Sequence, residues 1–332
     1  MRLSRIRSAP LTAQIFLCAV LGVPAVAYAA NCTTQAEMTP MDRDALSAAG
    51  QRLAAAVINQ DQATLQSALL TAVAKDWDGI REAVEQGAPA VKGGQVQLRN
   101  LYLLDATSLK APEDTQFFCS NATGSTTVTI SMRALPPGRY AVVLADAPGS
   151  ELAGQMAFIL GWEANTWKLG GVFARPGMLD GHDGVWYWEH ARQMAQADSP
   201  WAAYFSYEAA RYLLIPVEFI SSPNLEKLGQ EEGQLKNSPA DAMPYSVAAG
   251  DRTWKIDAMR FDPSLRHADV GATYESAGVG DPAAQRTEAI AVLSALLKAQ
   301  PAVRQSFHGM WAYASSGGRV TPVMELPMAQ IP

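Results

Sequence analysis

Two of the chain's four histidines lie within fifteen residues, LDGHDGVWYWEHARQ, from Leu179 to Gln193. The same stretch holds three carboxylates and three large aromatic side chains. Imidazole and carboxylate groups bind zinc and act as general acids and bases, so this stretch is the first candidate for a metal or catalytic centre. The candidate metal ligands are His182, Asp183, Glu189 and His190.

The spacing of these four residues suits a helix start better than a metal site. A helical zinc site commonly uses ligands four residues apart, whereas His182 and His190 are eight apart across an expected helix start. Glu189 points about 100 degrees around the helix from His190. Asp183 is placed to cap this helix, and Trp186 is expected to stack one turn below His190. We expect a structural role, with the metal site as the alternative.

No other pattern along the chain predicts catalysis or cofactor binding. A Gly-x-Ser-x-Gly nucleophile motif is absent from the sequence, and Ser306 near His308 is interpreted as a helix end before a strand, with His308 packing. The segments GGQVQLRN and GVGDPAAQ lack the strand–loop–helix fingerprint of a phosphate site. We therefore expect no cofactor.

Aromatic residues of a helical hairpin are the candidate contacts for a ligand or partner. The hairpin is predicted from VWYWEHARQMAQ and SPWAAYFSYEAARYLLIP, with Ser199 and Pro200 beginning its second helix. Over about residues 183–215 it resembles a single tetratricopeptide-type unit, although no second copy follows. Packing of the rings in the core and between domains is the default interpretation, and contact with a ligand or partner is the functional one. The candidate residues are Trp186, Trp188, His190, Trp201, Tyr204 and Phe205.

The first 29 residues are typical of a secretory signal peptide. Three arginines precede an apolar run from Leu11 to Leu21, and Ala29 ends a segment suited to cleavage. No later window is long and apolar enough to span a bilayer. We expect cleavage near Ala29, a periplasmic or secreted location and no membrane insertion of the mature chain.

Cleavage there would leave Cys32 and Cys119 as the only thiols. Two cysteines in an oxidising compartment most simply form one disulfide, which would tie the N-terminus to a strand. Two free buried thiols are the alternative, because sequence does not show pairing.

The charge of the chain argues against polyanionic partners. The formal charge is −6, and it becomes −9 without the three arginines of residues 1–29. No lysine and arginine cluster interrupts this acidic sequence, and no basic pattern is interleaved with aromatic residues. We therefore expect neither nucleic acid nor an anionic lipid surface as a partner.

The periodicity of the N-terminal half predicts helices followed by strands. Thr39 and Pro40 begin the first helix, a second follows it, and a third is expected from Asp76 to Gln86, ending at Gly87. Strand patterns with short loops fill residues 95–176 and favour an antiparallel meander. Two of these strands, 155–162 and 167–173, are predicted to form a hairpin joined by EAN at residues 163–165. This order predicts an α+β domain.

Two motifs of this domain resemble the NTF2-like, cone-shaped α+β superfamily. LAAAVINQDQATLQSALL, from Leu53 to Leu70, is similar to its opening helix, polar break and second helix. MAFILGWEANTWKLGGVF, from Met156 to Phe173, is similar to its closing hairpin. The resemblance covers about residues 35–175 and implies helices packed on a curved antiparallel sheet around a pocket.

The resemblance implies that an enzyme of this family would carry a carboxylate, or a Tyr, His and Asp set, in the pocket. Tyr102, Asp105, Asp146 and Glu163 lie near the predicted strands but match no family motif. Asp105 and Asp146 each precede a loop, and we interpret them as turn residues.

The C-terminal part predicts a smaller α+β unit. Strands are expected in RTWKIDAMRF and ADVGATYES, a helix from about Pro282 to Ala299, and a hairpin turning at Ser315 to Gly318. Whether the helical hairpin packs between the two α+β units stays open. The predicted parts are a signal peptide (1–29), an NTF2-like domain (30–177), a helical hairpin with linker (178–235) and a C-terminal α+β unit (236–332).

These features predict an extracytoplasmic protein without enzymatic activity that binds a protein partner or a small apolar molecule. The alternative is a small-molecule hydrolase, lyase or isomerase that uses one carboxylate in the cone pocket. A metal-dependent activity at the His182 to His190 stretch is the third hypothesis.

Overall fold

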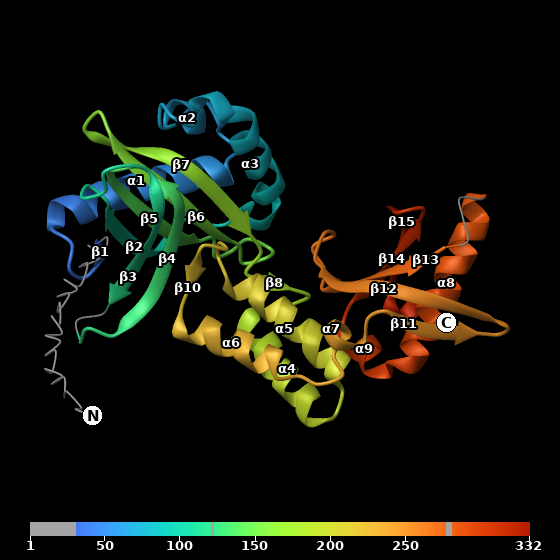
Figure 1. The fold of residues 1–332 in the computed structure, drawn as a ribbon. Helices are drawn as coiled ribbons and strands as arrows, with labels where there is room; N and C mark the ends of the chain where they lie inside the picture. Colours follow the sequence, from blue (N-terminus) through green and yellow to red (C-terminus); the bar gives the residue numbers. More distant parts are fainter. Residues whose placement is uncertain (1–30, 121–122, 277–280) are drawn as a thin grey trace, which may run out of the picture.

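The computed structural model describes residues 31–120, 123–276 and 281–332. Its elements form two lobes with mixed α+β structure and mainly antiparallel sheets, as the sequence predicts (Figure 1). The expected signal peptide and its cleavage point lie outside the described residues. None of the described helices is long and apolar enough to cross a membrane.

The N-terminal lobe has three layers. Its central sheet has the strand order β1-β2-β5-β6-β7, and a smaller sheet has the order β10-β4-β3. The central strands are β1 (Asn31–Thr34), β2 (Gln97–Asp105), β5 (Arg139–Asp146), β6 (Gln155–Glu163) and β7 (Thr166–Arg175). The smaller sheet holds β3 (Glu113–Ser120), β4 (Thr126–Leu135) and β10 (Ile220–Ser221). The helical layer holds α1 (Pro40–Ile58), α2 (Gln62–Ser67), the 3₁₀ turn η1 (Ala74–Asp76) and α3 (Trp77–Val91).

Local signals that the sequence predicts begin and end several of these elements. The Thr39 hydroxyl accepts a hydrogen bond from the backbone N–H of Asp42 and so caps α1. Ala164 and Asn165 both have positive φ, which is the mirror-image turn that matches the twist of the β6–β7 hairpin. Both predictions are confirmed.

The small sheet differs from the single meander that the sequence favours. The central sheet is apolar on both faces, and only one face packs against α1 and α3. Leu104, Val142 and Leu144 lie on the other face, where Phe117 of β3 and Ile130 of β4 cover them. The pair β3–β4 therefore leaves the main sheet because a second apolar face has to be removed from water.

The second lobe contains the helical hairpin and the C-terminal sheet, which has the strand order β11-β12-β13-β14-β15. The strands of this lobe are β8 (Met178–Leu179), β9 (His182–Asp183), β11 (Tyr245–Ala249), β12 (Arg252–Asp262), β13 (Asp269–Glu275), β14 (Gly309–Ser316) and β15 (Arg319–Pro327), of which β8 and β9 form a separate two-stranded sheet. Its helices are α4 (Gly184–Gln196), α5 (Pro200–Leu214), α6 (Pro223–Gly233), α7 (Pro239–Ala242), α8 (Pro282–Ala299) and α9 (Pro301–Ser306), and the chain ends with the 3₁₀ turn η2 (Met328–Gln330).

The hairpin and the C-terminal sheet share one hydrophobic core, which includes Phe205, Val270, Leu293 and Phe307. The end of α5 also contacts the N-terminal sheet, because the side-chain amide of Gln155 donates to the carbonyl of Leu213 at 2.6 Å. The hairpin therefore packs between the two α+β units, as Figure 1 shows.

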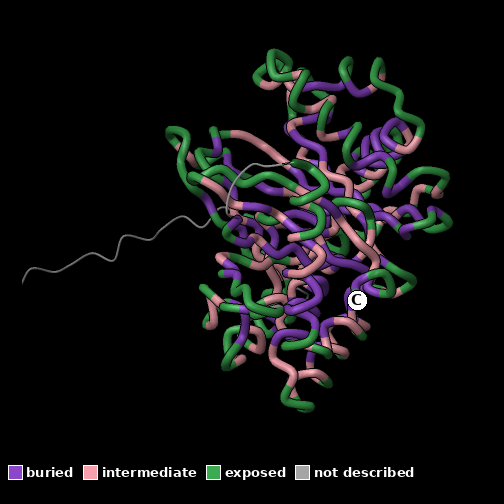
Figure 2. The backbone as a smooth tube through the Cα atoms, turned by 90° about the vertical axis from the view of Figure 1, so that its right-hand side faces the viewer, coloured by how far each residue is buried: buried purple, intermediate pink, exposed green. Residues whose placement is uncertain are grey.

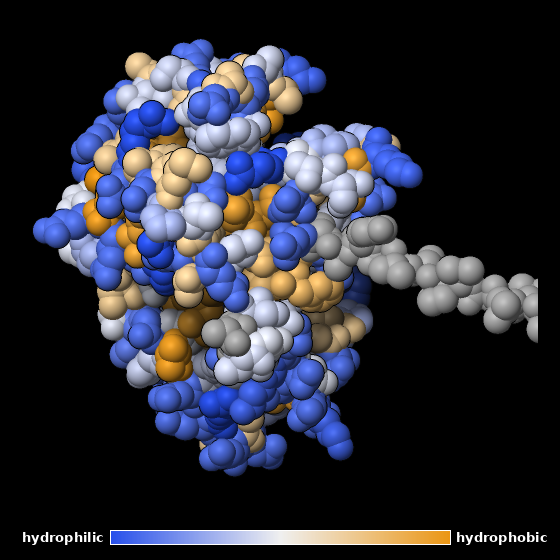
Figure 3. All heavy atoms as spheres, turned by 90° about the vertical axis from the view of Figure 1, so that its left-hand side faces the viewer, coloured by the Kyte–Doolittle hydropathy of each residue, from blue (hydrophilic) through white to orange (hydrophobic). Residues whose placement is uncertain are grey.

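Buried residues follow the strands and the inner helix faces, whereas most exposed residues lie at turns and ends (Figure 2). On the side of the N-terminal lobe, hydrophobic side chains form small patches among hydrophilic ones (Figure 3). The large apolar side chains are thus mostly gathered in the three cores.

A disulfide joins Cys32 of β1 to Cys119 of β3 across 87 residues, as predicted. Replacing both cysteines by alanine should lower the free energy of unfolding by about 4 kcal/mol, because the bond restricts a long loop of the unfolded chain. Urea unfolding of the oxidised protein and of the double variant measures this difference. Equal midpoints and slopes for the two proteins would contradict it.

Helix α3 runs four residues beyond the predicted end at Gly87. A Cβ at Gly87 would lie 2.7 Å from the carbonyl oxygen of Ala174, so this glycine permits close approach of α3 to β7 rather than ending the helix.

Gly87→Ala should therefore destabilise the fold by about 1 to 3 kcal/mol. Gly79→Ala is the matched control, since nothing lies within 4 Å of its Cβ position, and it should stabilise by about 0.5 kcal/mol. Chemical unfolding that ranks the two variants the other way would refute this role.

Candidate functional site

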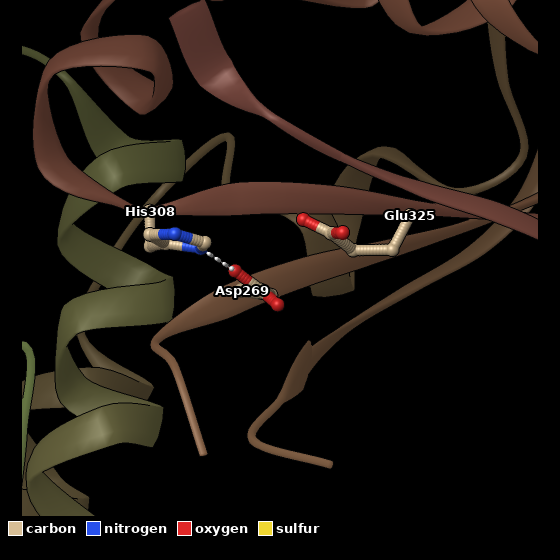
Figure 4. Close-up of side chains that lie close together, drawn as sticks. All are labelled: Asp269, His308 and Glu325. Carbon is tan, nitrogen blue, oxygen red and sulfur yellow. Dashed lines mark hydrogen bonds and ion pairs between the residues drawn. The ribbon is translucent and has the colours of Figure 1, made fainter. Parts of the chain in front are cut away.

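Strands β13, β14 and β15 bring two carboxylates and one imidazole together (Figure 4). Asp269 begins β13, His308 directly precedes β14, and Glu325 lies in β15. One possible ligand atom from each side chain lies within 4.8 Å of the other two. His308 Nδ1 is 3.0 Å from Asp269 Oδ1, at hydrogen-bonding distance. Within the described ranges, this is the only group of three or more such side chains that is close enough to hold a metal ion. We call it the carboxylate–histidine cluster.

The register of the sheet explains this convergence. Asp269 pairs with Gly309 in the parallel ladder, and Trp311 pairs with Glu325 in the antiparallel one. Residues paired across strands point to the same face of a sheet, and so do residues two apart on one strand. Gly309 and Trp311 are two apart on β14, so their partners Asp269 and Glu325 lie on the same face, on either side of Gly309. A Cβ at Gly309 would lie 2.5 Å from Glu325 Oε1 and 3.0 Å from Asp269 Oδ1. The glycine therefore keeps the space between the two carboxyl groups open.

A second histidine–carboxylate pair supports the cluster from outside. The His267 ring stacks on the His308 ring with centroids 3.8 Å apart. Asp180 holds His267 through Nδ1 at 2.6 Å and also accepts a hydrogen bond from the backbone N–H of Ala268 at 2.7 Å. Asp180 lies with Gly181 in the tight turn between β8 and β9. The start of the helical hairpin is thereby joined to the start of β13.

Burial makes the two carboxyl groups unusual. Asp269 is 0% exposed, and its Oδ2 and Glu325 Oε1 are buried without a hydrogen-bond partner. Burial raises the pKa of Asp269, against the hydrogen bond and charge of His308. Burial and the nearby charge of Asp269 raise the pKa of Glu325. Such groups hold a proton more readily than an exposed carboxyl group does, or they are neutralised by a bound cation.

A cleft of about 800 Å³ lies between the two lobes. Helix α3 and β7 line one side, and the other side is formed by the end of β12, the loop after it and Tyr313 of β14. Three arginines line the cleft together with aromatic and aliphatic side chains, while Asp262 is its single acidic residue. The cationic and aromatic lining residues are Arg175, Phe173, Tyr212, Arg260, Phe261, Arg266 and Tyr313.

A network of polar contacts stabilises the wall of the cleft that β12 and β14 form. The Tyr313 hydroxyl donates to Asp262 at 2.6 Å, and the Arg260 guanidinium lies over the Tyr313 ring at 4.1 Å from its centroid. Burial of Asp262 opposes ionisation, but hydrogen bonds from Ser264 and Tyr313 lower its pKa overall. Burial and the hydrogen bond to Asp262 raise the pKa of Tyr313 to about 12. Among the described residues Arg266 has no ion-pair partner, so its guanidinium is free for a ligand.

The structure does not bring together His182, Asp183, Glu189 and His190, the residues of the alternative metal site. The Trp186 ring lies between the two imidazoles, with centroids 3.6 Å from His182 and 4.8 Å from His190. Asp183 caps α4 by accepting from the backbone N–H of Trp186 at 2.8 Å, as the structural interpretation predicts. Glu189 is exposed and takes no part in the His–Trp–His stack. The imidazoles therefore pack on an indole ring instead of converging on one point.

Two of the aromatic contact candidates are core residues. Trp201 is 3% exposed and Phe205 is 0% exposed, so a partner cannot reach these rings on the folded surface. Tyr204 is partly buried and packs edge to face on Phe205. The Trp188 ring lies under the Arg192 guanidinium, and its Nε1 donates to Glu231 at 2.7 Å. The hairpin aromatics thus mainly hold helices together, in agreement with the default interpretation of core packing.

The carboxylates near the N-terminal strands each have a hydrogen-bond or ion-pair partner. Asp105 accepts from the backbone N–H and hydroxyl of Thr107, which confirms a turn role. Glu163 accepts from the backbone N–H of Thr71 at 3.0 Å. Asp146 pairs with Arg99 at 3.1 Å, and burial raises its pKa. Tyr102 is buried between the two sheets of the lobe.

Sequence reasoning missed Asp180, His267, Asp269 and Glu325 because their partners are distant in the chain. The sequence places His308 only near Ser306, whose hydroxyl lies 3.1 Å from His190 Nε2 in the structure. The sequence offers only a weak signal for them: in HAD, at residues 267–269, and in MEL, at residues 324–326, the acidic residue alternates with core residues, as any outward-facing strand residue does.

Comparison with protein families, with curated proteins and with solved structures finds no match to this chain. The resemblances to the NTF2-like superfamily and to a tetratricopeptide-type unit therefore stay predictions.

His190 links α4 to α9 and should make stability depend on pH. Burial, with a smaller contribution from the charge of His182, lowers its pKa below 6.5. Near and below pH 6.5 the folded protein then binds fewer protons than the unfolded chain. The contribution of neutral His190 to the free energy of unfolding is therefore complete above pH 6.5 and is lost as the pH falls below that value. In His190→Gln the corresponding fall in unfolding free energy between pH 7 and pH 5 should be absent.

Urea unfolding across that pH range measures this dependence. Ser306→Ala removes the hydrogen-bond partner but keeps the imidazole, and it should retain the wild-type pH dependence. Identical pH profiles for wild type and His190→Gln would contradict the assignment.

Proposed function

We propose that this protein is an extracytoplasmic binding protein that holds a small molecule with an acidic group and an apolar body in the cleft between its lobes. The observation that carries this proposal is the gathering of Arg175, Arg260 and Arg266 around one cleft in a chain whose formal charge is −6. Arg260 pairs with Asp262, the single carboxylate of the lining, and Arg175 pairs with Glu218, so among the described residues Arg266 carries the unpaired positive charge of the cleft.

The lining suits an organic acid in size and chemistry. A volume of about 800 Å³ lies in the range of small-molecule sites. Guanidinium groups bind carboxylate or phosphate oxygens through paired hydrogen bonds. Phe173 and Phe261 offer apolar contact beside these charges. The lining therefore favours an amphipathic anion over the purely apolar ligand expected from the sequence.

The expected location agrees with a binding role outside the cytoplasm. The Cys32–Cys119 disulfide is typical of an oxidising compartment, and the first 29 residues predict export. Burial of Trp201 and Phe205 gives the small-molecule proposal more support than docking of a protein on the hairpin. Asp105, Asp146 and Glu163 are each held by a hydrogen bond or an ion pair, which gives the carboxylate-enzyme alternative less support.

A fluorescent aromatic sulfonate, 8-anilinonaphthalene-1-sulfonate, is the first probe because it joins one anionic group to an apolar ring system. Arg266→Asn should weaken its binding about tenfold, since one charge-assisted contact is lost. Asparagine suits this position because Arg266 has a positive φ of 66°. Fluorescence titration of the folded protein measures the dissociation constant.

The matched control is Arg286→Asn, which removes an exposed arginine of α8 that does not line the cleft. It should bind the probe as the wild type does. Equal weakening in both variants, or in neither, would contradict ligand binding at the cleft.

A further inference from the structure

We propose that Asp269, His308 and Glu325 form a binding site for one divalent transition-metal ion. None of the three lines the cleft, so this site does not depend on the proposed ligand. Glu325 Oε1 is buried without a hydrogen-bond partner, and Asp269 is fully buried. A buried carboxylate is stable when it is paired or coordinates a metal, and two of them balance the charge of one divalent cation.

The distances fit ligands around a single ion. Ligand bonds of about 2.0 to 2.2 Å place neighbouring donor atoms roughly 3.0 to 3.5 Å apart. His308 Nδ1 and Asp269 Oδ1 are 3.0 Å apart, so a cation can replace the proton that they share. The Glu325 carboxyl group points toward the other two side chains in Figure 4 and lies within 4.8 Å of them. A small rotation of this flexible side chain completes the set.

The backbone leaves room for the ion. Gly309 lies between the two carboxyl groups, and its missing Cβ would stand 2.5 Å from Glu325 Oε1. Any other residue at this position would push Glu325 away from Asp269. The glycine at position 309 thus leaves space for an ion between the two carboxyl groups, and Gly309→Ala tests that role directly.

The donor set selects the class of metal. One imidazole nitrogen with two carboxylate oxygens suits zinc or manganese, whereas calcium and magnesium prefer oxygen ligands alone. The His267 ring, held by Asp180, stacks on His308 and positions that imidazole without coordinating the ion. Outer contacts of this kind tune metal affinity.

The test uses the full chain without a histidine tag, after treatment with a chelator, and titrates it with Zn²⁺ by calorimetry. One saturable site is expected, with the bound metal confirmed by elemental analysis. Glu325→Gln and His308→Asn should each weaken Zn²⁺ binding at least about tenfold, and Gly309→Ala should weaken it as well. Near-ultraviolet circular dichroism checks that each variant is folded.

The double variant His182→Asn, Glu189→Gln is the matched control, because it removes a histidine and a glutamate that the structure does not bring together with other ligands. It should bind Zn²⁺ as the wild type does. The proposal is overturned if wild type shows no saturable site, if folded Glu325→Gln binds equally well, if the control loses binding, or if Mg²⁺ or Ca²⁺ displaces Zn²⁺ at comparable concentration. Since Glu325→Gln is nearly isosteric, its result remains informative even where Gly309→Ala fails to fold.

Discussion

The parallel pairing of β13 with β14 is the constraint on which the second lobe depends. Parallel strands require a crossover connection, and α8 with α9 supplies it. The crossover helices cover one face of the sheet with Leu293 and its neighbours, which leaves the opposite face for polar residues. Because the ladder sets Asp269 beside Gly309, and β15 then sets Glu325 across from Trp311, the same pairing creates the carboxylate–histidine cluster.

The helical hairpin connects this sheet to the rest of the molecule. Its aromatic rings enter the core shared with the C-terminal sheet, and the end of α5 reaches β6 through the bond from Gln155 to Leu213. The turn before α4 adds Asp180, which binds both His267 and the backbone of Ala268. The hairpin therefore fixes the position of the C-terminal sheet, and with it the far wall of the cleft.

Charge is distributed unevenly between the two candidate sites. The cluster holds buried carboxyl groups whose pKa values are raised by burial, whereas the cleft is lined by three arginines and one carboxylate, Asp262. An unpaired buried carboxylate attracts a cation, and a group of guanidinium groups attracts an anion. The two proposed ligands thus have opposite charge and separate lining residues, which allows each to be tested without the other.

The sequence by itself determined what depends on neighbouring residues: the caps at Thr39 and Asp183, the turns at 164–165 and 317–318, and the bounds of α8. It also predicted the Cys32–Cys119 pair, since few thiols were present to choose from. Only the tertiary structure decided the extension of α3 past Gly87, the separate β3–β4 sheet and the meeting of Asp269, His308 and Glu325. Short-range signals follow from local geometry and hydrogen bonding. These other features arise from strand register and burial between residues distant in the chain, such as Asp269 and His308, which are 39 residues apart.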